Sequence, residues 1–169
     1  MAGKVNTLQD FLVEQLRDLY SAETQIIANL PKMAKQTSHA DLRMAFEQHL
    51  KESEVHAQRL ERIGTMLNFT PSGHVCEAMK GIVREAAEWI AEDAPADVKD
   101  AGLISNAQRV EHYEIAGYGT ARAIAERLGH TEVVGLLEQT LQEEKSTDQK
   151  LTRLALSGVN DDAAANRGR

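Results

Sequence analysis

Cysteine is almost absent from this sequence, with Cys76 alone among 169 residues. A single thiol cannot form a disulfide within the chain, and it excludes metal sites built from several cysteines. Proline occurs three times, and aromatic residues make up 4% of the chain. Because proline breaks helix interiors, this scarcity leaves room for long helices, as in a helical protein that is 42% hydrophobic and 27% charged.

Long apolar runs and an excess of positive charge are missing as well. No stretch approaches the roughly 20 apolar residues that span a bilayer, and the opening MAGKVNTLQDFL lacks the apolar core of a secretion signal. The formal net charge is −7, whereas nucleic-acid-binding proteins normally carry a basic patch. We therefore expect a cytoplasmic globular protein that binds neither a membrane nor nucleic acid.

Apolar residues recur at helical spacing along nearly the whole chain. Loop residues interrupt this pattern at FTPSGH and DAPAD, so two pairs of long helices flank one short helix. Short connections within each pair predict two antiparallel hairpins, and the short helix lies in the longer crossover between them. This is an all-α, ferritin-like four-helix bundle with an additional short helix in the crossover connection. We expect the bundle to span residues 1–157 and residues 158–169 to form a loose C-terminal tail.

Acidic and histidine residues occur on helix faces that should be apolar. Each ionised carboxylate taken out of water costs several kcal/mol, whereas a whole domain is stable by only about 5–15 kcal/mol. Few Lys or Arg residues share these faces, so protonation, a water-filled groove or bound cations must offset the charge. A lone glutamate of this kind usually reaches water at the edge, but a set at one level favours divalent metal ions. The candidate metal ligands are Glu23, Glu52, His56, Glu111, Glu114, Glu144 and Asp148.

The two predicted hairpins repeat the same arrangement of ligands. In each hairpin, one helix offers a carboxylate. The partner helix offers a second carboxylate followed four residues later by another ligand, which gives the pairs Glu52 with His56 and Glu144 with Asp148. Bundles use such an arrangement to hold two metal ions in their core. Ligation by many oxygens and one imidazole favours iron or manganese over zinc or copper, while magnesium or calcium stays open for a site made of oxygens alone.

Other polar residues near the candidate metal ligands are not themselves predicted to be ligands. His49 lies one turn before Glu52, and it fits a hydrogen-bonded core histidine as well as a partner of a ligand. Glu54 and Glu143 lie off the apolar faces, so we expect solvent to surround them.

Four segments carry a resemblance to a known family. DLYSAETQ at 18–25, QHLKESEVH at 48–56, RVEHYEIAGYGTA at 109–121 and LQEEKSTDQKLTRLA at 141–155 resemble the YciE/YciF stress-protein family, and the VEHYEIA and EEK blocks are closer to YciF. The family is a rubrerythrin-related branch of the ferritin-like superfamily. The resemblance implies a homodimer with a role in bacterial stress responses, and it implies no established activity.

Rubrerythrin-like di-iron sites combine a helix glutamate, two ExxH motifs and a helix with two glutamates three residues apart. Glu23 matches the first element, and Glu111 with Glu114 matches the paired glutamates. The other two helices depart from ExxH, because each ligand pair is one residue longer and an aspartate replaces the second histidine.

Two classes of function follow, and the sequence does not decide between them. In the first, the protein holds two metal ions per chain, iron or manganese, and reacts with oxygen or peroxide as a di-iron oxidoreductase of the ferroxidase or peroxide-reducing type. In the second, it is a non-catalytic stress protein with a vestigial or structural metal site. An iron-storage cage is a weaker third reading, because the resemblance implies dimers.

Overall fold

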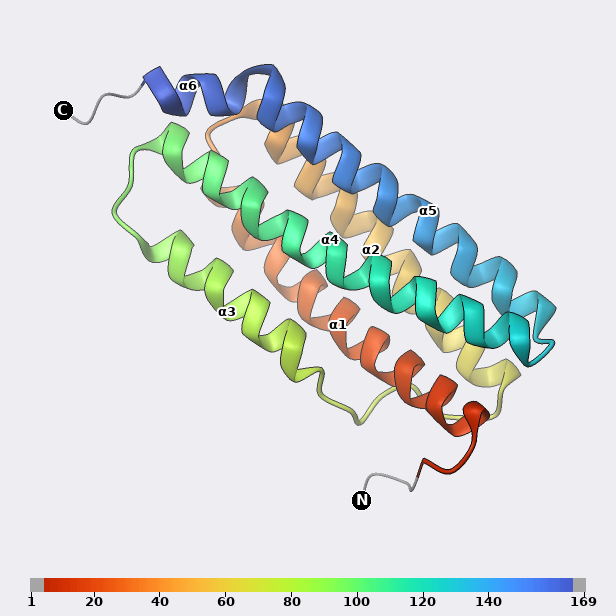
Figure 1. The fold of residues 1–169 in the computed structure, drawn as a ribbon. Coiled ribbons are helices and arrows are strands. Elements are labelled where there is room, and N and C mark those ends of the chain that lie inside the picture. The colour runs from red at the N-terminus through yellow and green to blue at the C-terminus, as the bar shows by residue number, and fades with distance from the viewer. Residues whose placement is uncertain (1–4, 166–169) are drawn as a thin grey trace.

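The computed structural model describes residues 5–165, which form a bundle of long helices (Figure 1). Thr7 begins the first helix with a capping box, in which its hydroxyl accepts from Asp10 N and the Asp10 carboxylate accepts from Thr7 N. The helices are α1 (Leu8–Gln36), α2 (Ala40–Met66), α3 (Glu77–Ala91), α4 (Ala96–Arg127), α5 (Thr131–Leu154), a π-helical turn η1 (Ala155–Val159) and α6 (Asn160–Ala165).

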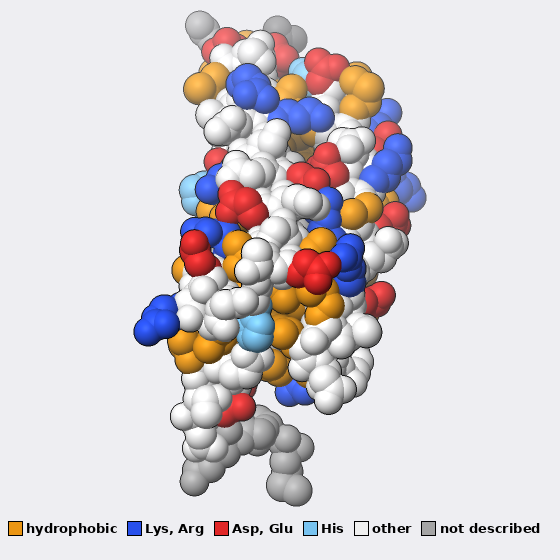
Figure 2. Space-filling model, turned by 90° about the vertical axis from the view of Figure 1, so that its right-hand side faces the viewer, with side chains coloured by type: hydrophobic (Ala, Val, Ile, Leu, Met, Phe, Trp, Pro, Cys, Tyr) orange, Lys and Arg blue, Asp and Glu red, His pale blue; other side chains and the backbone are white. Residues whose placement is uncertain are grey.

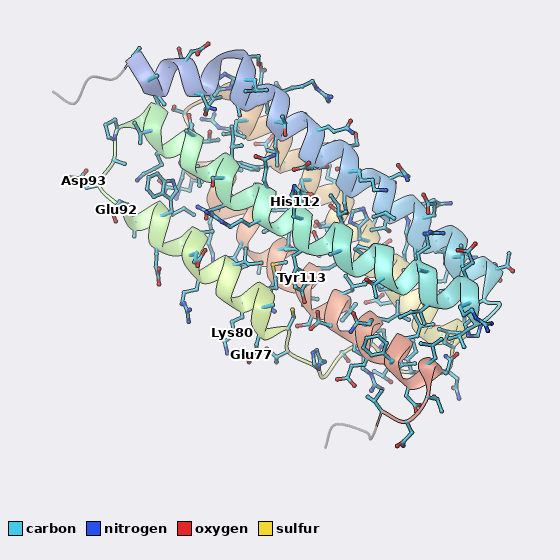
Figure 3. The ribbon with its side chains drawn as sticks, in the orientation of Figure 1. Glu77, Lys80, Glu92, Asp93, His112 and Tyr113 are labelled. Atoms are coloured by element: carbon cyan, nitrogen blue, oxygen red, sulfur yellow. The ribbon has the colours of Figure 1, made fainter. Side chains whose placement is uncertain are left out.

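Two antiparallel hairpins, α1 with α2 and α4 with α5, make the four-helix core (Figure 1). Helix α1 also packs on α4, and α2 packs on α5. The crossover between the hairpins contains α3, which lies against α1 and α4 and turns Glu77 and Lys80 outward (Figure 3). The predicted ferritin-like bundle with a short helix in its crossover is therefore confirmed.

The inward faces of the four long helices follow a spacing that alternates between three and four residues. This is the heptad spacing of helices that pack at small crossing angles. In α2 the buried residues that follow this spacing are Leu42, Phe46, His49, Ser53, His56, Leu60 and Ile63. The same alternation in α5 buries Val133, Leu137, Thr140, Glu144, Thr147 and Leu151.

The apolar core consists of two clusters, one toward each end of the bundle. One contains Ile26, Leu30 and Phe46, and the other contains Leu16 and Leu137. On every long helix the residues between these two clusters include polar ones, so a polar layer crosses the bundle at mid-height.

The chain does not become loose where the sequence predicted a tail. It continues from α5 through η1 into α6, whose two acidic residues Asp161 and Asp162 lie in the first turn, where they complement the helix dipole. Helix α6 packs on α4, which gives residues 158–165 a tertiary contact that hydrophobic periodicity did not reveal. The rest of the predicted tail, 166–169, lies outside the described residues.

Charges of both signs are interspersed on the surface drawn in Figure 2. Several charges pair locally, as Arg122 does with Glu126 at 3.2 Å and with Glu138 at 3.2 Å. None of the helices in the described range 5–165 is long and apolar enough to cross a membrane.

Helix α3 is fixed to α4 by a tight contact between Trp89 and Gly102. A Cβ atom at Gly102 would lie 2.0 Å from the Trp89 ring, and the ring nitrogen donates to the carbonyl of Lys99 at 3.1 Å. We expect Gly102→Ala to displace the indole and lower the free energy of unfolding by about 1–3 kcal/mol.

The matched control is Gly119→Ala on the same helix, where an added Cβ would meet nothing within 4 Å. Alanine is there expected to raise the stability by up to about 1 kcal/mol, because glycine is the poorer helix former. Urea unfolding followed by circular dichroism measures both variants. Equal changes in the free energy of unfolding of the two variants would contradict a tight contact between Trp89 and Gly102.

Candidate metal centre

The polar layer at the middle of the bundle is made of carboxylate and histidine side chains that solvent hardly reaches. Glu114 and Glu144 have no exposed surface, and 1% of His56 is exposed. We call this set the carboxylate–histidine layer. It consists of Glu23 on α1, His49, Ser53 and His56 on α2, Glu111 and Glu114 on α4, and Glu144 on α5.

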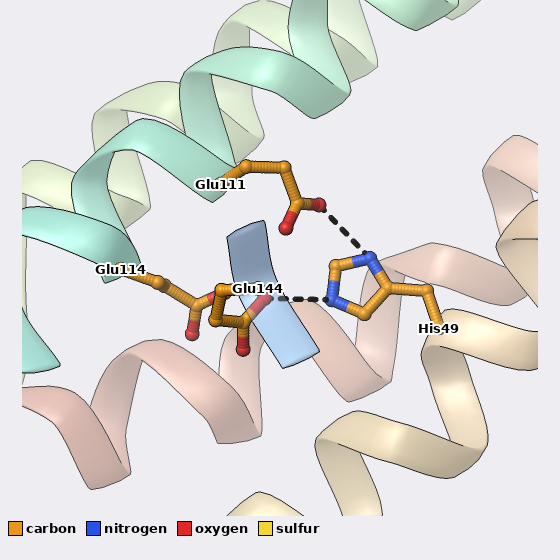
Figure 4. A group of neighbouring side chains, drawn as sticks. All are labelled: His49, Glu111, Glu114 and Glu144. Carbon is orange, nitrogen blue, oxygen red and sulfur yellow. Dashed lines mark ion pairs between the residues drawn. The ribbon is translucent and has the colours of Figure 1, made fainter. Parts of the chain in front are cut away.

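Four members of the layer form a first group of possible metal ligands (Figure 4). One donor atom from each of His49, Glu111, Glu114 and Glu144 lies within 4.8 Å of the others. His49 Nδ1 is 3.0 Å from Glu111 Oε1, and His49 Nε2 is 3.7 Å from Glu144 Oε2. Neighbouring ligands of an octahedral ion bound at roughly 2.1 Å lie about 3 Å apart, so these spacings suit a divalent metal ion.

A second group contains Glu23, His56 and again Glu144. His56 Nδ1 lies 2.8 Å from Glu144 Oε1 and 3.2 Å from Glu23 Oε1. The other side of Glu23 Oε1 receives the Tyr118 hydroxyl at 2.6 Å. Glu144 therefore directs one oxygen toward each group, which is how a carboxylate bridges two ions.

Unsatisfied polar atoms support ligation rather than mutual pairing. In the part of the chain that the structure describes, ten buried side-chain nitrogen and oxygen atoms have no hydrogen-bond partner, and all of them belong to the carboxylate–histidine layer. The close contacts of His56 Nδ1 lack the alignment of hydrogen bonds. Leaving such atoms unsatisfied costs about 1–3 kcal/mol each, and more when they are charged. Metal ions would satisfy the oxygens and the imidazole nitrogens together, so the residues fit such ions.

The orientation of His56 is set from outside the layer by Glu143. His56 Nε2 lies 2.9 Å from Glu143 Oε2, and Arg59 pairs with the same carboxylate, its Nη2 donating to Oε1 at 3.0 Å. Burial opposes ionisation, but Arg59 and His56 hold the pKa of Glu143 below its ordinary value. An ionised Glu143 accepts the Nε2 proton and leaves Nδ1 free to bind an ion. The expectation that Glu143 is merely solvated is therefore corrected.

Two of the seven ligands predicted from sequence are not brought into either group. Glu52 accepts from Gln48 at 2.8 Å and from Thr147 at 3.4 Å. Asp148 accepts from Gln108 at 2.9 Å and lies 3.3 Å from His112. Both carboxylates are partly exposed at the rim of the layer. The other five predicted residues lie inside it.

The heptad spacing accounts for the placement of Glu52 and Asp148 outside the two groups. The inward positions beside His56 and Glu144 are three residues away, at Ser53 and Thr147, and the four-residue spacing turned Glu52 and Asp148 toward the rim. His49, for which the sequence left a core histidine and a partner of a ligand open, lies on the same alternation of four and three residues from Leu42. The structure places it in the first group of possible ligands.

Burial makes the layer retain protons when no ion neutralises it. It raises the pKa of Glu111 and of Glu144 to about 8, and it raises that of Glu114 well above its ordinary value. For His56 burial acts in the opposite direction, but Glu144 and Glu23 outweigh it and raise the pKa to about 11. Binding of a metal ion must therefore displace protons.

Comparison with known proteins places the chain in a family. Residues 7–164 match the family described as a domain of unknown function, DUF892. The chain belongs to this family. A curated relative, Protein YciF of Escherichia coli (strain K12), is 43% identical over 157 residues, which cover 92% of this chain and 95% of the relative.

Solved structures agree with this assignment. The E. coli stress protein YciF superposes with a TM-score of 0.89 at 43% identity, covering 92% of this chain and 99% of that one. YcfI from Rhodopseudomonas palustris, for which a structural role has been suggested, gives 0.86 at 43% identity, with coverage of 90% and 97%. A ferritin-like, diiron-carboxylate protein from Bacillus anthracis str. Ames gives 0.70 at 22% identity, with coverage of 89% and 99%. That last likeness shows the fold alone.

On both α2 and α5, a buried hydroxyl residue lies three positions away from a buried histidine or glutamate. Ser53 and His56 are three residues apart on α2, and Glu144 and Thr147 are three apart on α5. Two contacts between α2 and α5 mirror each other. Glu143 on α5 contacts His56 on α2, and Glu52 on α2 accepts from Thr147 on α5. The layer thus takes both of its histidines from α2.

The raised pKa values predict how pH affects the metal-free protein. Glu111 and Glu144 hold their protons up to about pH 8 in the fold but ionise near 4.5 when unfolded, so the folded state binds more protons between these limits. The free energy of unfolding therefore falls as pH rises from 5 to 8, by up to about 1.4 kcal/mol per pH unit for each group.

Urea unfolding of chelator-treated protein at several pH values measures this slope. The double variant Glu111→Gln with Glu144→Gln removes both titrating groups and should give a flatter profile. A wild-type profile as flat as that of the double variant would refute the assignment.

Proposed function

We propose that this protein binds two divalent metal ions, iron in the first place and manganese as the alternative, in the carboxylate–histidine layer. The observation that carries the proposal is that all buried side-chain nitrogen and oxygen atoms of residues 5–165 that lack a hydrogen-bond partner lie in this one layer. Such a set is costly without a cation, because each buried carboxylate loses several kcal/mol of solvation.

His49, Glu111 and Glu114 would hold one ion, Glu23 and His56 would hold the other, and Glu144 would contribute to both. Hard oxygen donors with imidazole suit iron and manganese. A ferrous pair held there would supply the two electrons that, with two protons, reduce peroxide to two water molecules.

The residues around the pair have separate tasks in such a reaction. Glu143 and Arg59 hold the His56 ring, and Tyr118 holds one oxygen of Glu23. The two apolar clusters above and below the layer exclude water from it. The oxidant is proposed to be dioxygen or peroxide, in keeping with the stress protein YciF to which the chain is similar.

A non-catalytic role for the same centre is the second candidate. Ser53 and Thr147 stand at two inward positions where ExxH motifs carry a carboxylate and an imidazole, which reduces the number of strong ligands. The suggested structural role of YcfI points the same way. In that case metal would bind but its spectrum would not change with oxidant. The homodimer implied by the family resemblance stays a prediction.

The shared ligand provides the test of the metal site. We expect Glu144→Gln to lower the bound iron from two ions per chain to less than one, because both groups lose a charged ligand. Glu52→Gln and Asp148→Asn are matched controls outside the groups, and both should keep two ions per chain.

Elemental analysis after anaerobic ferrous loading and desalting measures the stoichiometry, and circular dichroism checks that each variant is folded. Adding peroxide to the loaded wild type should change its absorbance, which separates the redox function from the structural one. Loss of iron in Glu52→Gln but not in Glu144→Gln would overturn the proposed ligand set.

A further inference from the structure

A small cavity adjoins the carboxylate–histidine layer on its α3 side. It offers about 20 Å³ to the centre of a water-sized molecule, which is little more than the volume that a single such molecule needs. Helix α3 closes it from outside with Val83 and Ala86, α1 and α4 form its sides, and His49 and Glu111 lie at its inner end.

The walls of this cavity are almost entirely apolar. Asn29 beside it donates to the carbonyl of Gln25 at 2.7 Å and accepts from Lys32 at 3.0 Å, and the side-chain oxygen of Asn106 accepts from Arg109 at 3.1 Å. A polar molecule entering here would give up hydrogen bonds to water without replacing them along the walls, which costs several kcal/mol. The cavity therefore favours a small molecule that makes no strong hydrogen bonds.

The inner end of the cavity is different in chemistry. His49 is 2% exposed and its Nε2 has no hydrogen-bond partner, and both oxygens of Glu111 are likewise unpartnered. These atoms belong to the first group of possible ligands. A molecule in the cavity is thus next to the ion that His49 and Glu111 would hold.

We propose that dioxygen binds in this cavity and reaches the metal pair from the His49–Glu111 side, with α3 as the outer wall of its site. The apolar walls favour a diatomic gas over peroxide, and the position selects the ion of the first group. The inference about delivery to the metal rests on the proposed function, whereas binding of dioxygen in the cavity does not.

Neighbouring alanines on α3 offer a matched pair of variants. Ala86 is buried and lines the cavity, while Ala87 is exposed. Ala86→Val places two methyl groups in the cavity, and Ala87→Val makes the same change of helix propensity on the surface. Urea unfolding verifies that both variants are folded, and Ala86→Gly serves as a second variant that leaves the cavity open.

Dioxygen itself is the first probe, on metal-free protein. Because it is paramagnetic, it speeds the relaxation of nearby methyl protons in nuclear magnetic resonance under oxygen pressure. We expect the methyl groups of Val83 and Val110, which line the cavity, to relax at least about threefold faster than those of Val133, which is buried in the other cluster. Ala86→Val should remove this difference and Ala87→Val should keep it. Equal relaxation at Val83 and Val133 in the wild type overturns the proposal.

The second measurement uses ferrous-loaded protein mixed with dioxygen or peroxide in a stopped-flow spectrometer. Ala86→Val should slow oxidation by dioxygen about tenfold relative to Ala87→Val, equivalent to about 1.4 kcal/mol, and leave the rate with peroxide within about twofold. Equal dioxygen rates in the two variants overturn delivery through the cavity. Failure of the wild type to take up iron overturns the proposed function instead. The relaxation measurement on metal-free protein then tests by itself whether dioxygen binds in the cavity.

Discussion

Burial of several carboxylates at one level of a helical bundle is the constraint on which the rest of this structure depends. Glu111, Glu114 and Glu144 have no contact with solvent, and an arrangement of this kind is stable only if protons or cations neutralise it. The apolar clusters on both sides of the layer supply the stability that can carry such a cost, because they bury the long helices over their remaining length. The four long helices are thus a scaffold for one polar layer.

The two sides of the carboxylate–histidine layer differ in polarity. On the α5 side, His56 reaches the partly exposed Glu143 and Arg59, so hydrogen bonds connect the layer with water. On the α3 side, His49 and Glu111 border an apolar cavity closed by the crossover helix. The crossover helix α3 thus forms part of the boundary of the carboxylate–histidine layer.

The donors of the carboxylate–histidine layer are distributed unevenly over the four long helices. Inward positions of α2 and α5 carry hydroxyl groups at Ser53 and Thr147, and His49 adds an imidazole one turn before Ser53. Both imidazoles therefore come from α2, and the carboxylates come from α1, α4 and α5. The two groups of possible ligands therefore differ in their donors, and Glu144 belongs to both.

The sequence by itself determined the helices, their order and the polar layer. Periodicity and loop residues suffice for these features because each is local in the chain, and Glu23, Glu111 and Glu114 could be placed inward from their own helices. The resemblance added the YciE/YciF family, which the match to YciF at 43% identity confirms.

Only the tertiary structure decided which residues meet. Positions three and four residues away share a helix face, so sequence could not choose Ser53 over Glu52 or Thr147 over Asp148 until the neighbouring helices fixed the inward direction. The helical path of residues 158–165 and the cavity beneath α3 are likewise products of packing between distant segments. The periodicity of one helix does not predict such contacts, because another part of the chain supplies the surface on which the helix packs.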